Sequence, residues 1–400
     1  MNEYIKKLYS IAQKESRLII GLMSGTSLDG LDIAACNISG HGAATRVQMK
    51  KFVTIPYNTT FKKEIREIFS QPMISQAKLC LLNKYIATTH AAMINDCLKK
   101  WKIKKEAVDL IASHGQTVYH LPASAQPNNK YGSATLQIGD GDHIALHTGI
   151  ITISDFRQKH IAAGGDGAPL AVYGDHILFA EKNRNVIMLN IGGIANFSFL
   201  PAGLERNDIF STDTGPGNTL MDAWMQQNFP GKYYDKDAAI AKQGTPDKVL
   251  LAALLRHKFF SLPQPKTTGP ELFNMAYLEN AMASAKGKEL SRETVMATLN
   301  SFTAISISDA INRRISKNSN CMIYTSGGGI HNPLLMETLK KNITGASFHS
   351  TMEKHIDPDA KEAILFALLA NETVAGTGNS FGKMKTKAPK VNMGKISMPG

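Results

Sequence analysis

The chain has 400 residues, of which 43% are hydrophobic and 20% are charged. This composition is typical of globular proteins and excludes a wholly disordered chain, and the length predicts two domains or one large one. No segment approaches the roughly 18 apolar residues that a membrane span requires. The charges within residues 1–16 predict no secretory signal.

The net charge of +12 would suit a nucleic acid or an acidic small substrate. Part of the excess lies in two lysine-rich segments, Lys99–Lys105 and Lys383–Lys395. Trp101 is the only aromatic residue within the first, which therefore lacks the aromatic surface that stacks on nucleobases. We therefore expect a solvated face, a solvated tail and no nucleic-acid partner.

Four scattered cysteines show neither zinc-site nor disulfide spacing, which indicates reduced thiols in a cytoplasmic protein; they are Cys36, Cys80, Cys97 and Cys321.

Two segments are predicted to form a strand, a glycine-rich turn and a second strand. In residues 17–37 the turn is 24–30, and because a strand rather than a helix follows, it is not a P-loop. Residues 186–200 repeat the pattern around Gly192 and Gly193. This echo predicts two halves built on one plan.

Hydrophobic periodicity and turn residues predict the other elements. Strands are expected at 108–113, 149–154 and 321–325, and helices at 60–70, 76–100, 220–229, 293–317, from Pro333 and at 360–374.

Three glycine turns follow strands, at Gly25–Gly30, Gly192–Gly193 and Gly327–Gly329. Glycine lets the backbone approach a ligand, and exposed N–H groups bind anions. One such turn is usually only a tight turn. Three of them favour a clamp for nucleotide phosphates between two domains.

Several polar residues near strand ends have two interpretations that the residues alone leave open. Asp213 is either a turn residue or a general base, and Asp29 is either a turn residue or a Mg²⁺ ligand acting through water. His114 is either a ligand residue or a loop histidine bonded to backbone. The Gly-x-Ser-x-Gly match at Gly378–Gly382 lacks the strand–helix context of a nucleophile elbow, so acyl hydrolysis has little support.

A series of short motifs follows a fixed order along the chain: Gly21–Gly30, Ser113–Thr117, Leu136–Gly139, Asp155–Arg157, Ala162–Gly165, Gly167–Leu170, Leu189–Gly193, Asp213–Asn218, Met221–Trp224 and Gly327–Gly329. In this order they resemble the anhydro-N-acetylmuramic acid kinase family over nearly the whole chain. The resemblance implies the α/β fold of sugar kinases, actin and Hsp70, with two ribonuclease-H-like domains and an ATP cleft between them.

The resemblance also implies how the chain divides. Residues 1–155 with about 376–400 are expected to form an N-terminal domain with the first phosphate turn. Residues 156–375 are expected to form a C-terminal domain with the second phosphate turn, the catalytic aspartate and the adenosine-side glycine turn. The late helix is expected to pack back onto the first domain.

The activity implied by the resemblance uses ATP, Mg²⁺ and water to open the 1,6-anhydro bridge of the sugar and phosphorylate O6. The products are N-acetylmuramate 6-phosphate and ADP, formed during peptidoglycan recycling in the cytoplasm. A homodimer is also expected.

The site residues implied by the resemblance fall into four groups. Asp213 would be the catalytic base, and Asp29 would hold the metal. Arg157 would bind the lactyl carboxylate, because a guanidinium suits that planar anion, unless it only pairs with Asp155. The other sugar-binding candidates are His114, Gln116 and Glu362. The ATP-binding residues would be Gly25, Thr26, Ser27, Leu28, Asp29, Gly30, Leu31, Asp32, Asn190, Gly192, Gly193, Gly327, Gly328 and Gly329.

Three positions depart from the family pattern: His160 replaces an Asp, Asp166 replaces a Gln, and Pro270 replaces an Arg. They affect the expected sugar rather than the ATP segment. The alternatives are a conventional sugar kinase, which adds phosphate without water, and an actin- or Hsp70-like ATPase switch.

Overall fold

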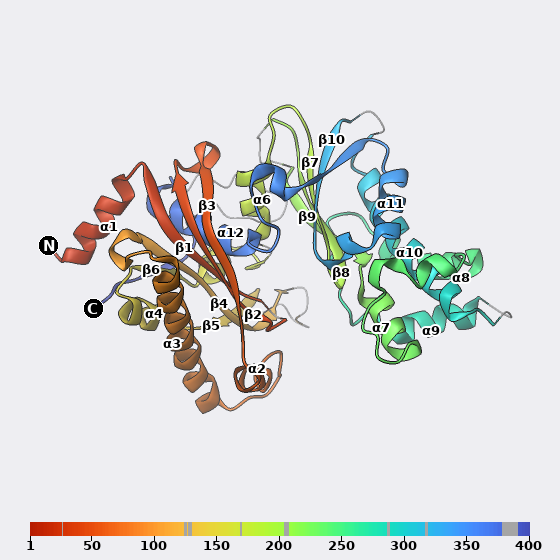
Figure 1. Ribbon diagram of the computed structural model, residues 1–400, viewed down its shortest axis with the longest axis horizontal. Helices are drawn as coiled ribbons and strands as arrows, with labels where there is room; N and C mark the ends of the chain where they lie inside the picture. Colours follow the sequence, from red (N-terminus) through yellow and green to blue (C-terminus); the bar gives the residue numbers. More distant parts are fainter. Residues whose placement is uncertain are drawn as a thin grey trace. The chain divides into compact units, whose positions relative to one another are not determined.

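The computed structural model describes residues 1–25, 27–123, 126, 130–168, 170–203, 208–285, 289–316, 319–377 and 391–400. Thr26, the Gly378–Gly382 motif and Lys383–Lys390 lie outside the described residues. The chain forms two compact units, the first made of Met1–Phe179 with His355–Gly400 and the second of Ala180–Lys354. Each unit contains one sheet with helices packed against it (Figure 1).

The first sheet has the strand order β12-β6-β4-β1-β2-β3, with β5 paired to β4. The β1–β2 and β2–β3 pairs are antiparallel, whereas β4 is parallel to both β1 and β6. Its strands are β1 (Ser16–Ser24), β2 (Gly30–Ser39), β3 (Arg46–Pro56), β4 (Leu110–Leu121), β5 (Ala134–Ile138), β6 (Thr152–Ser154) and β12 (Lys395–Ser397). Its helices are α1 (Glu3–Gln13), α2 (Thr59–Arg66), α3 (Gln76–Trp101), α4 (Gly141–Thr148), α5 (Phe156–Ala162), α6 (Ala171–Phe179) and α12 (Lys361–Ala375).

The second sheet has the order β11-β10-β7-β8-β9. The β7–β8 and β8–β9 pairs are antiparallel, and β10 is parallel to β7 and β11. Its strands are β7 (Val186–Ile191), β8 (Ile194–Leu200), β9 (Phe210–Pro216), β10 (Cys321–Ser326) and β11 (Ala346–Ser350). Its helices are α7 (Thr219–Asn228), α8 (Lys248–Leu255), α9 (Met275–Ser284), α10 (Arg292–Asn312) and α11 (Pro333–Asn342).

The two sheets share one plan. Three antiparallel strands, β1–β3 in one and β7–β9 in the other, are followed by two parallel strands reached through crossover connections. In both, the first hairpin carries the predicted glycine turn. The expected α/β fold with two ribonuclease-H-like sheets is thus confirmed.

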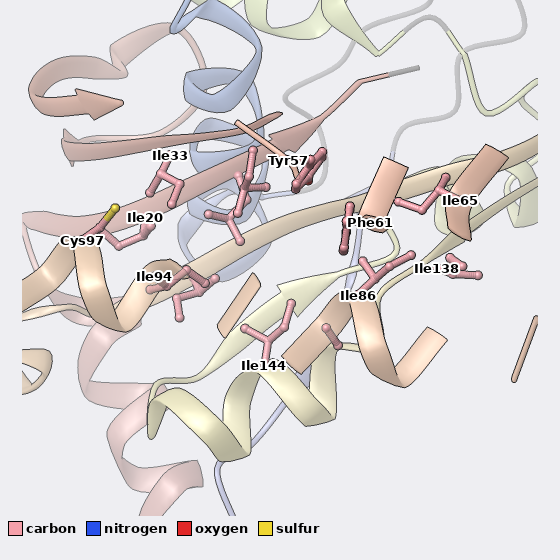
Figure 2. Close-up of a cluster of buried hydrophobic side chains, with 14 of the residues drawn as sticks. Ile20, Ile33, Tyr57, Phe61, Ile65, Ile86, Ile94, Cys97, Ile138 and Ile144 are labelled. Atoms are coloured by element: carbon pink, nitrogen blue, oxygen red, sulfur yellow. The ribbon is translucent and has the colours of Figure 1, made fainter. Parts of the chain in front are cut away.

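The two faces of β1 pack against different helices. Ile20 and Leu22 are buried in a core shared with Ile86 and Ile94 of α3, seen in Figure 2. Gly21 points the other way, where an added Cβ would lie 1.9 Å from the carbonyl oxygen of Ala363 in α12. Only glycine therefore lets α12 lie directly on the strand that carries the first turn.

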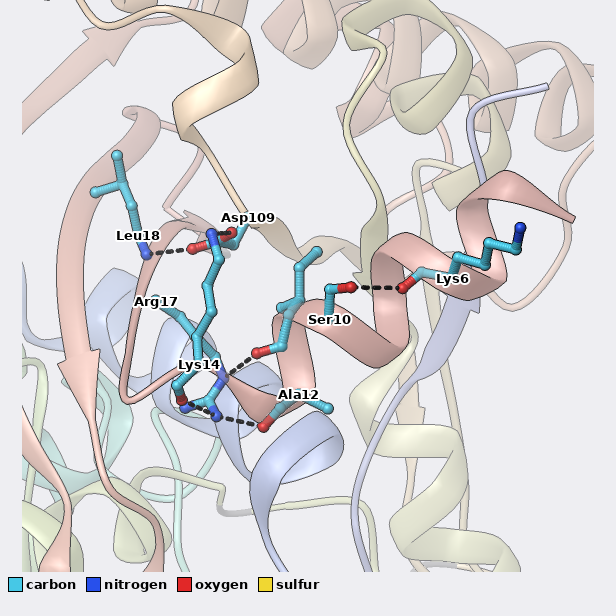
Figure 3. A network of polar contacts seen from close by, with 8 residues as sticks. Lys6, Ser10, Ala12, Lys14, Arg17, Leu18 and Asp109 are labelled. Atoms are coloured by element: carbon cyan, nitrogen blue, oxygen red, sulfur yellow. Dashed lines mark hydrogen bonds and ion pairs between the residues drawn. The ribbon is translucent and has the colours of Figure 1, made fainter. Parts of the chain in front are cut away.

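A polar network fixes the start of β1 (Figure 3). The Asp109 carboxylate accepts hydrogen bonds from the backbone N–H of Leu18 at 2.9 Å and from Lys14 Nζ at 2.5 Å. The Arg17 guanidinium donates to the carbonyls of Ile11, Ala12 and Lys14 at 2.7–2.9 Å. These carbonyls lie at the end of α1, where that of Ile11 also accepts from the N–H of Lys14, so Arg17 ties the helix to the strand.

The domain boundaries differ from those expected. Residues 156–179 and 355–375 belong to the first unit, because α12 packs on β1, β2 and β4 and contacts α6. The late helix packs on the first sheet, as expected. The segments 156–179 and 355–360 belong to the same unit.

The predicted strand at 108–113 continues to Leu121, because β5 pairs with its second half. Lys395, expected in a solvated tail, lies in β12 and pairs with Asp155 at 2.5 Å. Each of the four cysteines is a free thiol. No helix in the described part of the chain is long and apolar enough to cross a membrane.

Candidate active site

The first glycine turn joins β1 to β2. Leu28 has a φ of 58° and buries its side chain in the core, which anchors the middle of the turn. At Gly30 an added Cβ would lie 2.4 Å from the carbonyl oxygen of Ile55, so β3 requires glycine there. Ser27 and Asp29 remain exposed. Leu28 and Gly30 therefore fix the turn against the protein core, and the exposed residues Ser27 and Asp29 are available to a ligand.

Gln116 of β4 lies beneath this turn. Its Oε1 accepts from Ser24 Oγ at 2.5 Å, and its Nε2 donates to the carbonyls of Gly25 at 3.3 Å and Thr117 at 3.2 Å. The side chain is completely buried. The predicted sugar ligand Gln116 is thus engaged with the predicted phosphate turn.

His114 and Arg157 are in direct contact. Arg157 Nε donates to His114 Nε2 at 2.9 Å, and its Nη1 donates to the carbonyl of Gly167 at 2.9 Å. Burial, together with the Arg157 charge, lowers the pKa of His114 to about 3. The imidazole is therefore neutral and positions the guanidinium. Arg157 has no ion pair with Asp155, whose carboxylate pairs with Lys395.

Glu362 and Asp32 lie in the same electrostatic environment as Arg157. Desolvation raises the pKa of the Glu362 carboxyl, although part of its surface is exposed, and the charges of Lys361 and Arg157 oppose this. Desolvation also raises the pKa of Asp32, and its bond from Thr54 Oγ1, at 2.6 Å, opposes that rise. Residues predicted from three distant motifs thus come together in the first unit.

Two of the departures from the family pattern border Arg157. His160 Nδ1 accepts from the backbone N–H of Gly167 at 2.9 Å, the residue whose carbonyl binds Arg157. Asp166 accepts from Ser133 Oγ at 2.5 Å. These substitutions therefore shape the loop that holds Arg157.

The other glycine turns meet in the second unit. The carbonyls of Gly192 and Gly193 accept from the backbone N–H groups of Asn218 and Gly217 at 2.8 Å. Gly327 has a φ of 84°, and an added Cβ there would lie 2.7 Å from Asn190 Oδ1 and from the carbonyl oxygen of Ile191. Glycine is required where these backbones cross.

A cavity of about 650 Å³ opens beside this crossing. Its lining consists of Asn218, Met221, Asp222, Gln226, Tyr233, Tyr234, Asp235, Lys236, Asp237, Gly328, His331 and Asn332. At Gly328 the nearest atom to an added Cβ is Asn218 Nδ2, 3.6 Å away. The cavity is large enough for a nucleoside, and its edge at Gly328 can approach one closely.

Asp213 lies on β9 opposite Asn196 of β8. Its Oδ2 accepts from the backbone N–H of Thr268 at 2.8 Å, and its own N–H donates to the carbonyl of Lys266 at 2.9 Å. Burial raises its pKa to about 6; the Thr268 bond opposes this, and the charge of Glu271 adds to it. A carboxyl with this pKa is ionised at neutral pH and is an effective proton acceptor.

Lys266 was not predicted as a functional residue. It is 9% exposed, its Nζ donates to the carbonyl of Phe259 at 2.7 Å, and it lies 4.2 Å from the centroid of the Phe259 ring. Burial lowers its pKa to about 8. Its sequence signal is its place in the Lys266–Glu271 segment, which contains the departure at Pro270.

Asp29 is the predicted metal ligand. Its charge contributes a little to the raised pKa of Asp32, after burial and the charge of Asp359. Within the described ranges, no group of three or more His, Cys, Asp or Glu side chains could hold a metal ion. The donor set suits Mg²⁺ that is bound mainly through substrate phosphates.

The two sheets of one plan, the glycine turns and the nucleoside-sized cavity define the class of two-domain α/β proteins that includes the sugar kinases, actin and Hsp70. The chain belongs to the anhydro-N-acetylmuramic acid kinase family, whose model matches residues 17–398. It is therefore an enzyme of the kinase class, and this class implies ATP as the phosphoryl donor.

Relatives that bear the name anhydro-N-acetylmuramic acid kinase match nearly the whole chain. The protein from Pseudoalteromonas atlantica is 51% identical over 402 residues and covers 100% of both chains. The protein from Caldanaerobacter subterraneus is 37% identical, with 98% of this chain and 100% of the relative covered. Among solved structures, a Schistosoma mansoni hexokinase complexed with glucose is 12% identical, with a TM-score of 0.36 and coverage of 90% of this chain and 86% of the hexokinase.

Proposed function

We propose that this chain is an ATP-dependent kinase of 1,6-anhydro-N-acetylmuramic acid that opens the anhydro bridge with water and phosphorylates O6. The products would be N-acetylmuramate 6-phosphate and ADP, which suits peptidoglycan recycling. The full-length match to relatives with that name carries the proposal. The homodimer and the cytoplasmic location stay predictions.

Asp213 would act as the general base. It would take a proton from water, whose oxygen attacks C1 of the sugar. The C1–O6 bond breaks, O6 forms a bond to the γ-phosphorus of ATP, and ADP leaves. The raised pKa of Asp213 and its fixed orientation on the N–H of Thr268 support this role.

The cavity at Gly328 would hold the nucleoside, and the glycine turns would offer N–H groups to phosphates. Asp29 would hold Mg²⁺, which would neutralise phosphate charge when it is bound. Arg157 would bind the lactyl carboxylate of the sugar, because His114 and the Gly167 carbonyl fix its guanidinium plane. Glu362 would contact the same sugar.

The test is mass spectrometry of the product formed from anhydro-N-acetylmuramate, ATP and Mg²⁺. We expect a gain of phosphate plus water, which Asp213→Asn abolishes and Glu279→Gln, at an exposed carboxylate of α9, preserves. A gain of phosphate alone would instead indicate a conventional sugar kinase. ATP hydrolysis with an unchanged sugar would indicate an ATPase switch.

A further inference from the structure

A continuous chain of buried side-chain hydrogen bonds runs from α3 to the first glycine turn. His90 Nε2 lies 2.9 Å from the hydroxyl of Tyr57, which lies 2.7 Å from Ser24 Oγ. Ser24 Oγ lies 2.5 Å from Gln116 Oε1, and Gln116 Nε2 bonds to the carbonyl of Gly25 at 3.3 Å. All four side chains are at most 4% exposed.

The positions of the protons in this series of hydrogen bonds follow from the bonds of Gln116, at one end of the series. Two carbonyl oxygens can only accept, so the Gln116 amide nitrogen must face Gly25 and Thr117, and its oxygen must face Ser24. Ser24 therefore donates to Gln116, and Tyr57 donates to Ser24.

The direction of the remaining bond is then determined as well. With the Tyr57 proton already used, His90 must donate through Nε2. Burial lowers the pKa of His90 to about 3, which agrees with one neutral tautomer. Each member thus has a single orientation, set by its neighbour.

This orientation has a consequence for the turn. The carbonyl of Gly25 accepts from Gln116 and also, at 3.4 Å, from the N–H of Leu28. A carbonyl held in this way points into the protein, whereas a carbonyl turned outward would repel an anion. The amide group of Gln116 is already engaged in hydrogen bonds with Ser24, Gly25 and Thr117. Gln116 is therefore poorly placed to contact a sugar.

We propose that His90, Tyr57, Ser24 and Gln116 are positioning residues that hold the first glycine turn in its phosphate-binding conformation, and that Gln116 acts on the nucleotide rather than on the sugar. The inference rests on the proposed function, because that function makes the turn a phosphate site.

Tyr57→Phe directly tests the relay, by which we mean the series of side-chain hydrogen bonds from His90 to Gln116. It removes one hydroxyl and keeps the ring, which packs 4.3 Å from the Phe61 ring (Figure 2). We expect the dissociation constant of a non-hydrolysable ATP analogue, measured by calorimetry, to rise about 10-fold, with the KM for ATP rising in parallel and the KM for the sugar within about twofold of wild type.

The matched control is Tyr277→Phe. It removes a half-buried hydroxyl that donates to the carbonyl of Leu254 in the second unit, and the melting temperature of each variant is measured with its affinities. If both variants lower the melting temperature but only Tyr57→Phe weakens nucleotide binding, the relay is supported. Equal effects on binding would overturn it.

Gln116→Glu provides a second test that does not depend on Tyr57. The carboxylate can still accept from Ser24, but it cannot donate to Gly25. We expect weaker nucleotide binding and an unchanged sugar KM. A higher sugar KM with unchanged nucleotide binding would overturn the proposal and return Gln116 to the sugar site.

The two proposals fail in different ways. A wild-type protein that binds the ATP analogue but leaves the anhydro sugar unchanged contradicts the proposed function, while the relay is still judged from analogue binding. A wild-type protein that does not bind the analogue overturns the relay.

Discussion

The backbone N–H of Thr268 donates a hydrogen bond to Oδ2 of Asp213 over 2.8 Å. This bond favours the ionised carboxyl, whereas burial favours the protonated form and raises the pKa to about 6. The balance leaves Asp213 charged at neutral pH, oriented, and more basic than an exposed aspartate.

We expect kcat to fall as the pH decreases through about 6, because protonated Asp213 cannot accept a proton. Burial also raises the pKa of Asp222 to about 6, but that residue lines the nucleoside-sized cavity. Asp222→Asn should therefore change the KM for ATP and keep the acid limb of kcat. A kcat that is constant between pH 5 and 7 in the wild type would contradict the role of Asp213 as the base.

Lys266→Met should destabilise the protein by about 1–3 kcal/mol, because the substitution removes the hydrogen bond of the buried ammonium to the Phe259 carbonyl, which keeps only the N–H of Leu262 as a donor. It should also lower kcat, because the Lys266 carbonyl binds the N–H of Asp213. Urea unfolding and steady-state kinetics measure the two effects. Lys258→Met, at an exposed lysine nearby, is the control; equal losses in both variants would refute the anchoring role.

Gly327→Ala and Gly328→Ala should separate folding from binding. At Gly327 the added methyl would meet atoms 2.7 Å away in a left-handed conformation, so we expect a loss of stability of about 1–3 kcal/mol. At Gly328 the methyl has room but projects toward the nucleoside-sized cavity. That variant should keep its melting temperature and bind ATP more weakly. The reverse pattern would show that the cavity is not the nucleotide site.

Stability should fall as the pH decreases from about 6.5 toward 4. Burial lowers the pKa of His90 and His114 to about 3 and of His160 to about 4, so the unfolded state takes up protons first. Each histidine would lower the free energy of unfolding by about 2 kcal/mol at pH 5. The melting temperature of His90→Gln should therefore depend less on pH than that of His41→Gln, at an exposed position. If the melting temperatures of the two variants changed equally with pH, His90 would not be buried in its neutral form.

Local sequence patterns determined the hairpin at 17–37, the helix at 76–100 and the three glycine turns, because strand alternation, helical spacing and turn chemistry act over a few residues. The repeated hairpin also predicted two sheets of one plan. The order of motifs led to the family and to Asp213, although the chemistry of Asp213 was open from the residues alone.

Tertiary structure decided what those residues touch. It brought Asp32, Arg157 and Glu362 into one electrostatic environment, and it placed the side chain of Gln116 in a hydrogen bond with the carbonyl of Gly25. It also placed residues 156–179 and 355–375 with the first sheet. The sequence could not show this, because packing between segments hundreds of residues apart depends on which surfaces fit together, and that fit leaves no periodic signal along the chain.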